Sequence, residues 1–451
     1  MNFKGYKILV LGAGISGVAV AEILQNNGAD ATLNDSKPID KIKIDFSHLK
    51  NLGVKLIFGE QNEDLLNGTD CIVVSPGISI NLPLIKNAKE LGILVMSEIE
   101  VAYQLCKAPI IAVTGTNGKT TTTTLVGEML ETTGKEVVVG GNIGTALSKE
   151  VESVNSQGLV VAEISSFQLE GIIDFKPKVA AVLNLTPDHL DRHYTMQNYK
   201  FTKEAIFKNQ TSEDYLVLNY DDPQIRDMSE RASSQIMYFS RNTILDNGVY
   251  VNNGIITIAW NNQKYEVCPV TALKIKGGHN VENALAACGV AFLAGAQITD
   301  LANVISKFRG VEHRIEMVSA INGVEYYNDS KATNPESSIK ALEAFDEEII
   351  LIAGGRDKNT NLDEFMNLIK KKAVHLIVLG EAKERFKEAA KKSGVSSIHS
   401  VESLNEAVTL AHSLAKPNQV VILSPACSSY DMFSNYEERG RVFKNLVLQL
   451  S

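Results

Sequence analysis

Residues 110–121 combine the residue types that bind phosphate groups. An apolar run at 110–113 leads into a glycine-rich loop that ends in Gly118, Lys119 and Thr120, and a predicted helix follows. Glycines let backbone N–H groups turn toward an anion, the helix points its unpaired amides at the same place, and a lysine adds a mobile cation. The hydroxyl of Thr120 is a ligand type for Mg²⁺.

This loop is a shortened relative of the common nucleoside-triphosphatase loop. The strict pattern has a glycine five positions before Gly118, where this chain has Val113. A polar turn with an incidental lysine is the alternative, but strand, loop and helix all fall where the motif requires them. We therefore expect ATP as the ligand. The residues expected to bind its phosphates are Gly115, Thr116, Asn117, Gly118, Lys119, Thr120 and Thr121.

A second glycine-rich loop, at 12–17, directly follows an apolar run, and Asp35 stands at the end of the next one. The spacing fits a dinucleotide site, in which the acidic residue binds a ribose. It fits equally another diphosphate, such as that of a UDP-linked substrate, because backbone amides recognise phosphates and not nicotinamide. A tight turn without a ligand is the third interpretation, and the sequence alone does not decide between them. Gly77 follows a further predicted strand and could contact the same ligand.

Charged side chains follow two predicted strands of the next region. Glu163 ends the run at 159–163, and Asp188 and His189 come after the run at 179–185. In parallel α/β sheets ligands gather at the carboxyl ends of strands, so we expect these side chains near a Mg²⁺ over the phosphate loop. The alternative for each is a helix-capping or solvated loop residue.

Other candidates have ordinary explanations. Lys203 lies on a predicted amphipathic helix, a pattern that favours an exposed lysine. Asn280 and Asn283, three apart on one predicted helix, either face an adenine edge or hydrogen-bond locally. Cys427 has no neighbouring histidine to activate it, so we expect a small buried residue.

The composition excludes several classes of partner. The chain has 451 residues and a formal net charge of −9, so we expect neither nucleic acid nor an anionic membrane as a partner. Five cysteines without CxxC spacing suit reduced thiols. Glycines interrupt the first apolar run, which predicts no signal peptide and no membrane insertion. We expect a cytoplasmic protein.

Apolar runs alternate with helical stretches along the chain, a pattern typical of mostly parallel sheets covered by helices. The alternation restarts near Ile110 and after Gly310. We therefore predict three α/β domains: a Rossmann-like domain at 1–105, a central P-loop ATPase-type domain at 106–310 and a C-terminal Rossmann-like domain at 311–451. Asparagine-rich turns within 249–267 predict a small antiparallel side element on the central domain.

Together these segments resemble the Mur ligase family, ATP-dependent enzymes that form the amide bonds of the peptidoglycan peptide stem. The resemblance covers the whole chain and rests on the segments 114–121, 163–168, 183–193, 279–284, 313–314 and 328–335. Within the family, residues 424–433 followed by Arg439 and Gly440 resemble the C-terminal signature of the members that add D-glutamate. Tyr436 departs from that signature, because Phe is common there.

The resemblance implies a reaction. The carboxylate of UDP-N-acetylmuramoyl-L-alanine would attack the γ-phosphorus of ATP to give an acyl phosphate, and the amine of D-glutamate would then displace phosphate. It also implies two Mg²⁺ ions. Their ligands would be Thr120, Glu163, His189 and Lys203, the last as a carbamate because an ammonium cannot bind a cation.

The remaining roles are likewise implied by the resemblance, and a monomer is expected. Catalysis would fall to Lys119, Glu163, His189 and Lys203. Asn280, Asn283, Arg314 and Asp329 would complete the ATP site. The UDP-linked substrate would contact Ile15, Ser16, Asp35, Ser36, Lys37, Gly77, Asn142 and His189. D-Glutamate would contact Lys331, Thr333, Lys358, Ser429 and Tyr436.

Other functions fit parts of the sequence. An NAD-dependent oxidoreductase would use the first glycine loop and leave the phosphate loop idle. A folate polyglutamate ligase, or another amide ligase of the family, would share the ATP core, although folate needs no diphosphate site. A non-catalytic ATP-gated regulator is the last alternative.

Overall fold

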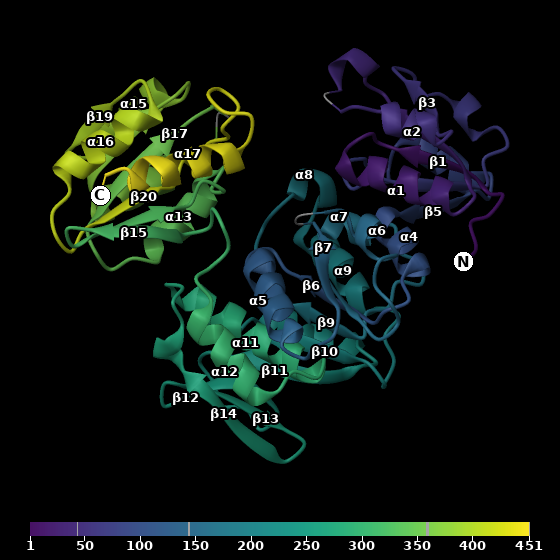
Figure 1. Ribbon diagram of the computed structural model, residues 1–451, viewed down its shortest axis with the longest axis horizontal. Helices are drawn as coiled ribbons and strands as arrows, with labels where there is room; N and C mark the ends of the chain where they lie inside the picture. Colours follow the sequence, from purple (N-terminus) through teal and green to yellow (C-terminus); the bar gives the residue numbers. More distant parts are fainter. Residues whose placement is uncertain (43, 143–144, 358–359, 451) are drawn as a thin grey trace. The chain divides into compact units, whose positions relative to one another are not determined.

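The computed structural model describes residues 1–450 except 43, 143–144 and 358–359. It forms two compact units, one of residues 1–272 and 281–306 and the other of residues 273–280 and 307 onward. Three separate sheets are present (Figure 1). The mostly parallel α/β architecture is as predicted. The domain boundaries at 105/106 and 310/311 stay predictions.

The first sheet has five parallel strands in the order β3-β2-β1-β4-β5. Its strands are β1 (Lys7–Leu11), β2 (Asp30–Asp35), β3 (Lys55–Phe58), β4 (Cys71–Val74) and β5 (Leu94–Ser97). Its helices are α1 (Ile15–Asn26), α2 (Ser47–Asn51), α3 (Pro83–Glu90) and α4 (Glu98–Leu105). A Cβ on Gly17 would lie 1.8 Å from the carbonyl oxygen of Gly12, so this glycine lets α1 pack directly against the loop after β1.

The central sheet has nine strands in the order β14-β13-β12-β11-β10-β9-β6-β8-β7. Its strands are β6 (Ile110–Thr114), β7 (Val137–Gly141), β8 (Leu159–Glu163), β9 (Val179–Val182), β10 (Tyr215–Asn219), β11 (Gln235–Ser240), β12 (Gly248–Asn252), β13 (Ile255–Trp260) and β14 (Gln263–Pro269). The antiparallel hairpins expected at 249–267 are present at one edge of this sheet. Strand β12 pairs in parallel with β11, so the hairpins continue the sheet itself.

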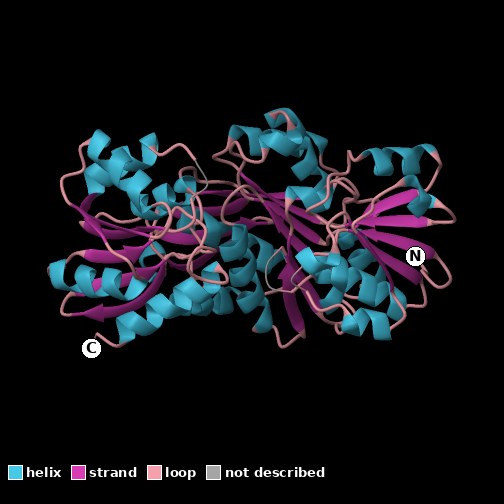
Figure 2. Ribbon diagram, turned by 90° about the horizontal axis from the view of Figure 1, so that it is seen from above, coloured by secondary structure: helices cyan, strands magenta, loops and turns pink. Residues whose placement is uncertain are grey.

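Helices cover both faces of the sheets (Figure 2). Those of the central region are α5 (Lys119–Glu131), α6 (Leu147–Glu150), α7 (Ser166–Leu169), α8 (Leu190–His193), α9 (Met196–Glu204), α10 (Pro223–Arg226), α11 (Gly278–Leu293) and α12 (Ile298–Lys307). Strands β6, β8 and β9 are almost continuous apolar runs because both of their faces are buried.

Two carboxylates on α4 join the first sheet to the central region. Glu100 is fully buried and accepts hydrogen bonds from the backbone N–H groups of Ile173 at 2.8 Å and Phe175 at 3.0 Å. Glu98 accepts one from the N–H of Ser148 at 2.9 Å, and burial raises the pKa of this carboxyl. These bonds satisfy backbone donors that would otherwise be buried unpaired, so they hold both sheets in one unit.

The third sheet, in the second unit, has the order β15-β16-β20-β17-β18-β19 and is parallel except for the β15–β16 pair. Its strands are β15 (Glu316–Ile321), β16 (Val324–Asn328), β17 (Ile349–Gly354), β18 (Ala373–Leu379), β19 (Ile398–Ser400) and β20 (Val420–Leu423). Its helices are α13 (Pro335–Glu343), α14 (Asp363–Lys372), α15 (Lys383–Ser393), α16 (Leu404–Leu414) and α17 (Tyr436–Leu448). Strands β11, β15 and β19 were not among the strands expected from sequence.

Candidate active site

The phosphate loop joins β6 to α5, and its shape requires glycine. Gly118 caps α5 with a φ of +81°, and a Cβ there would lie 2.1 Å from Oδ1 of Asn283. Asn184 holds the loop from the end of the neighbouring strand. Its Oδ1 accepts a hydrogen bond from the N–H of Asn117 at 2.8 Å, and its Nδ2 donates to the carbonyl of Asn117 at 3.0 Å.

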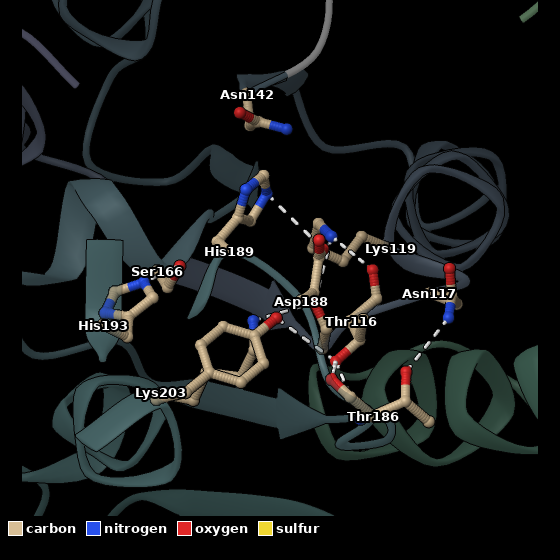
Figure 3. Close-up of polar contacts among 12 residues, drawn as sticks. Thr116, Asn117, Lys119, Asn142, Ser166, Thr186, Asp188, His189, His193 and Lys203 are labelled. Atoms are coloured by element: carbon tan, nitrogen blue, oxygen red, sulfur yellow. Dashed lines mark hydrogen bonds and ion pairs between the residues drawn. The ribbon is translucent and has the colours of Figure 1, made fainter. Parts of the chain in front are cut away.

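Two lysine side chains point at the same loop (Figure 3). Lys119 Nζ donates to the carbonyl oxygens of Gly115 and Thr116, each at 2.9 Å. Lys203 Nζ, from α9, donates to the carbonyl oxygen of Gly115 at 2.9 Å. The exposed position that the helical pattern favours for Lys203 is wrong, because only 1% of this residue is exposed. Burial, assisted by the charge of Lys119, holds the pKa of Lys203 well below its usual value.

Glu163 ends β8 beside the strand that carries the phosphate loop, since it pairs with Val113. Its Oε1 accepts a hydrogen bond from Asn142 Nδ2 at 2.7 Å. Its Oε2 is buried and has no hydrogen-bond partner among the described residues. A buried carboxylate oxygen without a donor fits a cation ligand. Thr120, on the first turn of α5, is also buried.

His189 and Asp188 lie in the loop before α8. Their side chains are 3.4 Å apart, from His189 Nε2 to Asp188 Oδ2, and both are about half exposed. The His189 ring packs against Phe167 of α7, with centroids 4.7 Å apart. His193 is instead buried, with its Nε2 3.0 Å from Ser166 Oγ, and burial lowers the pKa of this imidazole. His189 is therefore the histidine available to a ligand, and His193 supports the loop.

A cavity of about 560 Å³ opens beside the first glycine loop. Every residue that the sequence predicted to contact the UDP-linked substrate lines this cavity, except His189. Its lining comprises Ile15, Ser16, Asp35, Ser36, Lys37, Gly77 and Asn142, together with Gly12, Gly14, Ser75, Pro76, Ile78, Gly141, Ala146 and Gln168. Asn142 both lines this cavity and donates to Glu163, so the cavity reaches the surroundings of the phosphate loop.

Asp35 uses both carboxylate oxygens within the wall of the cavity. Oδ2 accepts a hydrogen bond from the N–H of Ala13 and Oδ1 from the N–H of Lys37, each at 2.9 Å. The carboxylate therefore shapes the glycine loop. Any contact with a ribose would have to share these oxygens.

The second unit holds the remaining candidates. Asp329 is buried and accepts a hydrogen bond from Ser424 Oγ at 2.7 Å, and burial raises the pKa of this carboxyl to about 7. Arg314 Nε is buried without a hydrogen-bond partner among the described residues. Ser429 is buried, and Lys331 Nζ lies 5.5 Å from the ring centroid of Tyr436. Thr333 is half-buried, and Lys358 lies outside the described residues.

The environments of three further candidates bear on their interpretation. Burial raises the pKa of the Cys427 thiol to about 12, so the expectation of a small buried residue is confirmed. The Asn280 amide donates to the carbonyl of Lys276 at 2.7 Å, which is a local contact. The side chain of Asn283 lies at the phosphate loop, over Gly118.

One cluster of three potential metal ligands occurs among the described residues, at Glu312, His313 and Glu316. Lys444 Nζ lies 3.1 Å from Glu312 Oε1 and 2.5 Å from Glu316 Oε1. Because the lysine ammonium already pairs with both carboxylates, this cluster is better explained as an ion-pair network.

Three family models match the chain: the Mur ligase MurD-like N-terminal domain over residues 6–97, the Mur ligase middle domain over 113–291 and the Mur ligase glutamate ligase domain over 313–427. The curated UDP-N-acetylmuramoylalanine--D-glutamate ligase of Thermoanaerobacter sp. (strain X514) is 46% identical over 100% of both chains. That of Clostridioides difficile (strain 630) is 41% identical over the same share of each. The chain belongs to the Mur ligase family.

Solved structures of Mur ligases have the same fold. UDP-N-acetylmuramate-alanine ligase MurC from Thermotoga maritima aligns with a TM-score of 0.61 at 21% identity and covers 99% of this chain and 100% of that one. MurF ligase from the same organism, in complex with ADP, aligns with a TM-score of 0.58 at 17% identity. The alignment covers 99% of this chain and 96% of that one. The three-domain fold predicted from sequence is thereby confirmed.

Sequence reasoning gave no role to several residues of this Mur ligase site. Asn184 clamps the phosphate loop, and the hydroxyl of Tyr199 lies 3.2 Å from Thr116 Oγ1. Arg192 bonds to both Glu170 and the first domain. The position of Asn184 at a strand end was the available signal. For Tyr199 the signal was its helical spacing of four residues from Lys203.

Proposed function

We propose that this chain ligates D-glutamate to UDP-N-acetylmuramoyl-L-alanine, with conversion of ATP to ADP and phosphate, in the cytoplasmic synthesis of peptidoglycan precursors. Full-length identity of 41–46% to curated D-glutamate ligases supports the reaction. One geometric observation supports the site: Asn142 lines the cavity and donates to Glu163 beside the phosphate loop. A substrate whose UDP part fills the cavity can therefore extend its carboxylate toward the γ-phosphate of ATP.

The chain's own groups bind and neutralise the phosphates. Backbone N–H groups of the loop and of the first turn of α5 bind the triphosphate, and the Lys119 ammonium moves from loop carbonyls to the phosphate oxygens. Thr120, Glu163 and His189 are suited to hold Mg²⁺, and the unpartnered Oε2 of Glu163 supports this assignment. When bound, Mg²⁺ neutralises the charge that develops on the transferred phosphoryl group.

The chemistry needs no protein nucleophile. The L-alanyl carboxylate attacks the γ-phosphorus, the bond between that phosphorus and the β-phosphate oxygen breaks, and ADP leaves. The D-glutamate amine then attacks the acyl carbon and expels phosphate. The residues act by positioning and by charge neutralisation, in agreement with a buried, protonated Cys427.

Lys203 is proposed to act as a carbamate. Its buried amine donates to the carbonyl oxygen of Gly115, and the carboxylates of Asp188 and Glu163 offset only part of the lowering of its pKa by burial and by Lys119. A neutral amine adds to CO₂ by forming an N–C bond and releasing one proton, which leaves an anion with two oxygen ligands. The reaction converts an amine that burial keeps from being protonated into an anionic group that can bind Mg²⁺ beside the phosphate loop.

Residues of the second unit complete the proposal. Arg314 and Asp329 are assigned to ATP, and Lys331, Thr333, Ser429 and Tyr436 to D-glutamate, with Lys358 retained from the sequence alone. Asn280 is assigned to adenine together with Asn283. The protein is proposed to act as a monomer, for which light scattering after gel filtration should give the mass of one chain. Among the described residues, no helix is long and apolar enough to cross a membrane.

The test is phosphate release from ATP in the presence of UDP-N-acetylmuramoyl-L-alanine, with D-glutamate, L-glutamate, lysine and diaminopimelate compared at equal concentration. We expect release only with D-glutamate, and a product heavier than the UDP substrate by one glutamyl residue. Release with another amino acid would move the chain to a different specificity within the family. Reduction of NAD without phosphate release would overturn the proposal.

A further inference from the structure

Arg192 connects the loop that carries His189 to the first domain. Its Nη2 donates to the carbonyl oxygen of Ile78 at 2.8 Å. The same guanidinium pairs with both carboxylate oxygens of Glu170, at 3.2 and 2.5 Å, and lies 4.7 Å from the ring centroid of Phe167. Only 15% of the Arg192 side chain and 13% of the Glu170 side chain are exposed. Water therefore screens these contacts weakly, and they are stronger than those of a surface pair.

The acceptor of this bond belongs to the wall of the cavity. Ile78 closes a turn after β4, in which its N–H donates to the carbonyl of Ser75 at 2.9 Å. Its side chain contacts the first glycine loop, because a Cβ on Gly12 would lie 2.8 Å from Ile78 Cγ1. Ser75, Pro76, Gly77 and Ile78 all line the cavity. Holding the carbonyl of Ile78 therefore holds one side of the cavity.

The bond to Ile78 is not needed to hold the two sheets together, since Glu98 and Glu100 of α4 already do so. What Arg192 adds is a fixed link between the cavity wall and the segment that begins at His189. The planar guanidinium makes several such bonds at fixed angles, which a lysine ammonium does not.

We propose that Arg192 is a positioning residue for the ligation. It sets the distance between the diphosphate part of the UDP-linked substrate and the reacting end at His189 and Glu163. The inference rests on the proposed function. It predicts that loss of Arg192 weakens binding of the UDP-linked substrate and misplaces its carboxylate, while the ATP site keeps its affinity.

The experiment compares Arg192→Ala and Arg192→Lys with Arg226→Ala. Arg226 is a matched control because it also covers a ring, that of Tyr220 at 4.9 Å, and donates to a carbonyl, that of Tyr220 at 3.3 Å. For each full-length variant we would measure kcat and the KM for each substrate. Hydrogen–deuterium exchange over residues 75–79, without ligands, reports the cavity wall directly.

We expect Arg192→Ala to raise the KM for UDP-N-acetylmuramoyl-L-alanine at least tenfold and to lower kcat, with the KM for ATP within twofold of wild type. Exchange at 75–79 should accelerate several-fold. Arg192→Lys should be intermediate, and Arg226→Ala should match wild type. Unchanged exchange together with an unchanged KM for the UDP substrate would overturn the inference, as would an equal rise in the KM for ATP.

Glu170→Gln keeps the inference testable if Arg192→Ala does not fold. It leaves Arg192 in place but weakens the ion pair that holds its guanidinium. The KM for UDP-N-acetylmuramoyl-L-alanine and the exchange rate at residues 75–79 should therefore rise by a smaller factor, and no change in either would contradict the proposal. If wild type released no phosphate with D-glutamate, the proposed function would fail. The exchange measurement would still decide whether Arg192 holds the cavity wall.

Discussion

The glycine loops after β1 and after β6 each join a buried parallel strand to the N-terminus of a helix within the same unit. Around the first loop there is an open cavity, and a carboxylate, Asp35, accepts backbone N–H groups of its wall. Around the second loop there are two lysine amines, an unpartnered carboxylate oxygen and two asparagine side chains.

The difference in side chains around the two loops corresponds to the difference between binding a phosphate group and transferring one. Backbone amides and a helix N-terminus are enough to hold a diphosphate, and both loops supply them. Transfer also needs cations and metal ligands where charge develops, and the candidates for these roles among the described residues, Lys119, Lys203 and the unpartnered oxygen of Glu163, lie around the second loop. Glycine spacing thus indicates that an anion binds, and the side chains from neighbouring strands indicate what happens to it.

The largest effect is expected from Lys119→Ala. Removal of this ammonium should lower D-glutamate-dependent phosphate release by about 10³-fold or more, because it takes away charge neutralisation at the transferred group. Affinity for the UDP-linked substrate, measured by calorimetry without ATP, should stay within twofold. The exposed Lys135, beyond the end of the same helix, gives the control Lys135→Ala. If Lys119→Ala kept more than a few per cent of the wild-type phosphate release, the proposed role of the second loop in phosphoryl transfer would be contradicted.

Lys203→Ala should also be inactive, because it removes the group proposed to carry the carbamate. Unlike Lys119→Ala, it should regain part of its activity when acetate or another short carboxylate is added, since the anion can occupy the space of the carbamate. Lys200→Ala is the control on the same helix. Lys200 pairs with Asp227 and Glu204, so its loss should change stability more than turnover. Absence of rescue would leave Lys203 as a buried hydrogen-bond donor to the loop.

A matched pair of glycine substitutions sharpens the comparison. Gly118→Ala should destabilise the chain by about 1–2 kcal/mol because of its positive φ, and should raise the KM for ATP because its Cβ would displace Asn283. Gly14→Ala should fold as wild type, since its φ is −81° and nothing lies within 4 Å of the added Cβ. Denaturant unfolding and both KM values measure the difference. Equal destabilisation by the two changes would mean that the loops are under the same constraint.

The smallest effect is expected from Asp35→Asn. Asp35 accepts hydrogen bonds from two backbone N–H groups, and in the variant one of these groups would face the NH₂ of the amide instead of an oxygen. The loss of one hydrogen bond costs about 1 kcal/mol, so the KM for the UDP-linked substrate should rise roughly three- to tenfold. The KM for ATP should not change.

NADH should not bind the wild-type protein in a fluorescence titration. Saturable NADH binding at this loop would favour the oxidoreductase interpretation.

Most of the fold and the two glycine loops could be predicted from sequence because their signals are local. An apolar run followed by Gly118 and Lys119 specifies strand, loop and helix within a dozen residues. The antiparallel strands were also predicted, but their attachment to β11 was not, because pairing between strands distant in sequence leaves no mark in either one.

The environment of single side chains was the part that sequence could not supply. Lys203 has the spacing of an exposed helical lysine, yet α9 turns it into the protein beneath the phosphate loop. Arg192 appeared as one charge in a polar loop, and its partner Ile78 is more than a hundred residues away. Glu163 was predicted correctly to end a strand, but the lack of a donor at its Oε2 is a property of packing alone.

The carboxylates of α4 affect how the chain can be divided. Although α4 follows the last strand of the first sheet, its Glu98 and Glu100 hold backbone groups of residues 148 and 173–175. An autonomous ATP-binding fragment should therefore begin at Ser97 and not at Lys107, where it would lack these acceptors for the N–H groups of Ser148, Ile173 and Phe175. Limited proteolysis is expected to spare α4 for the same reason, and to cut first in exposed turns farther from it.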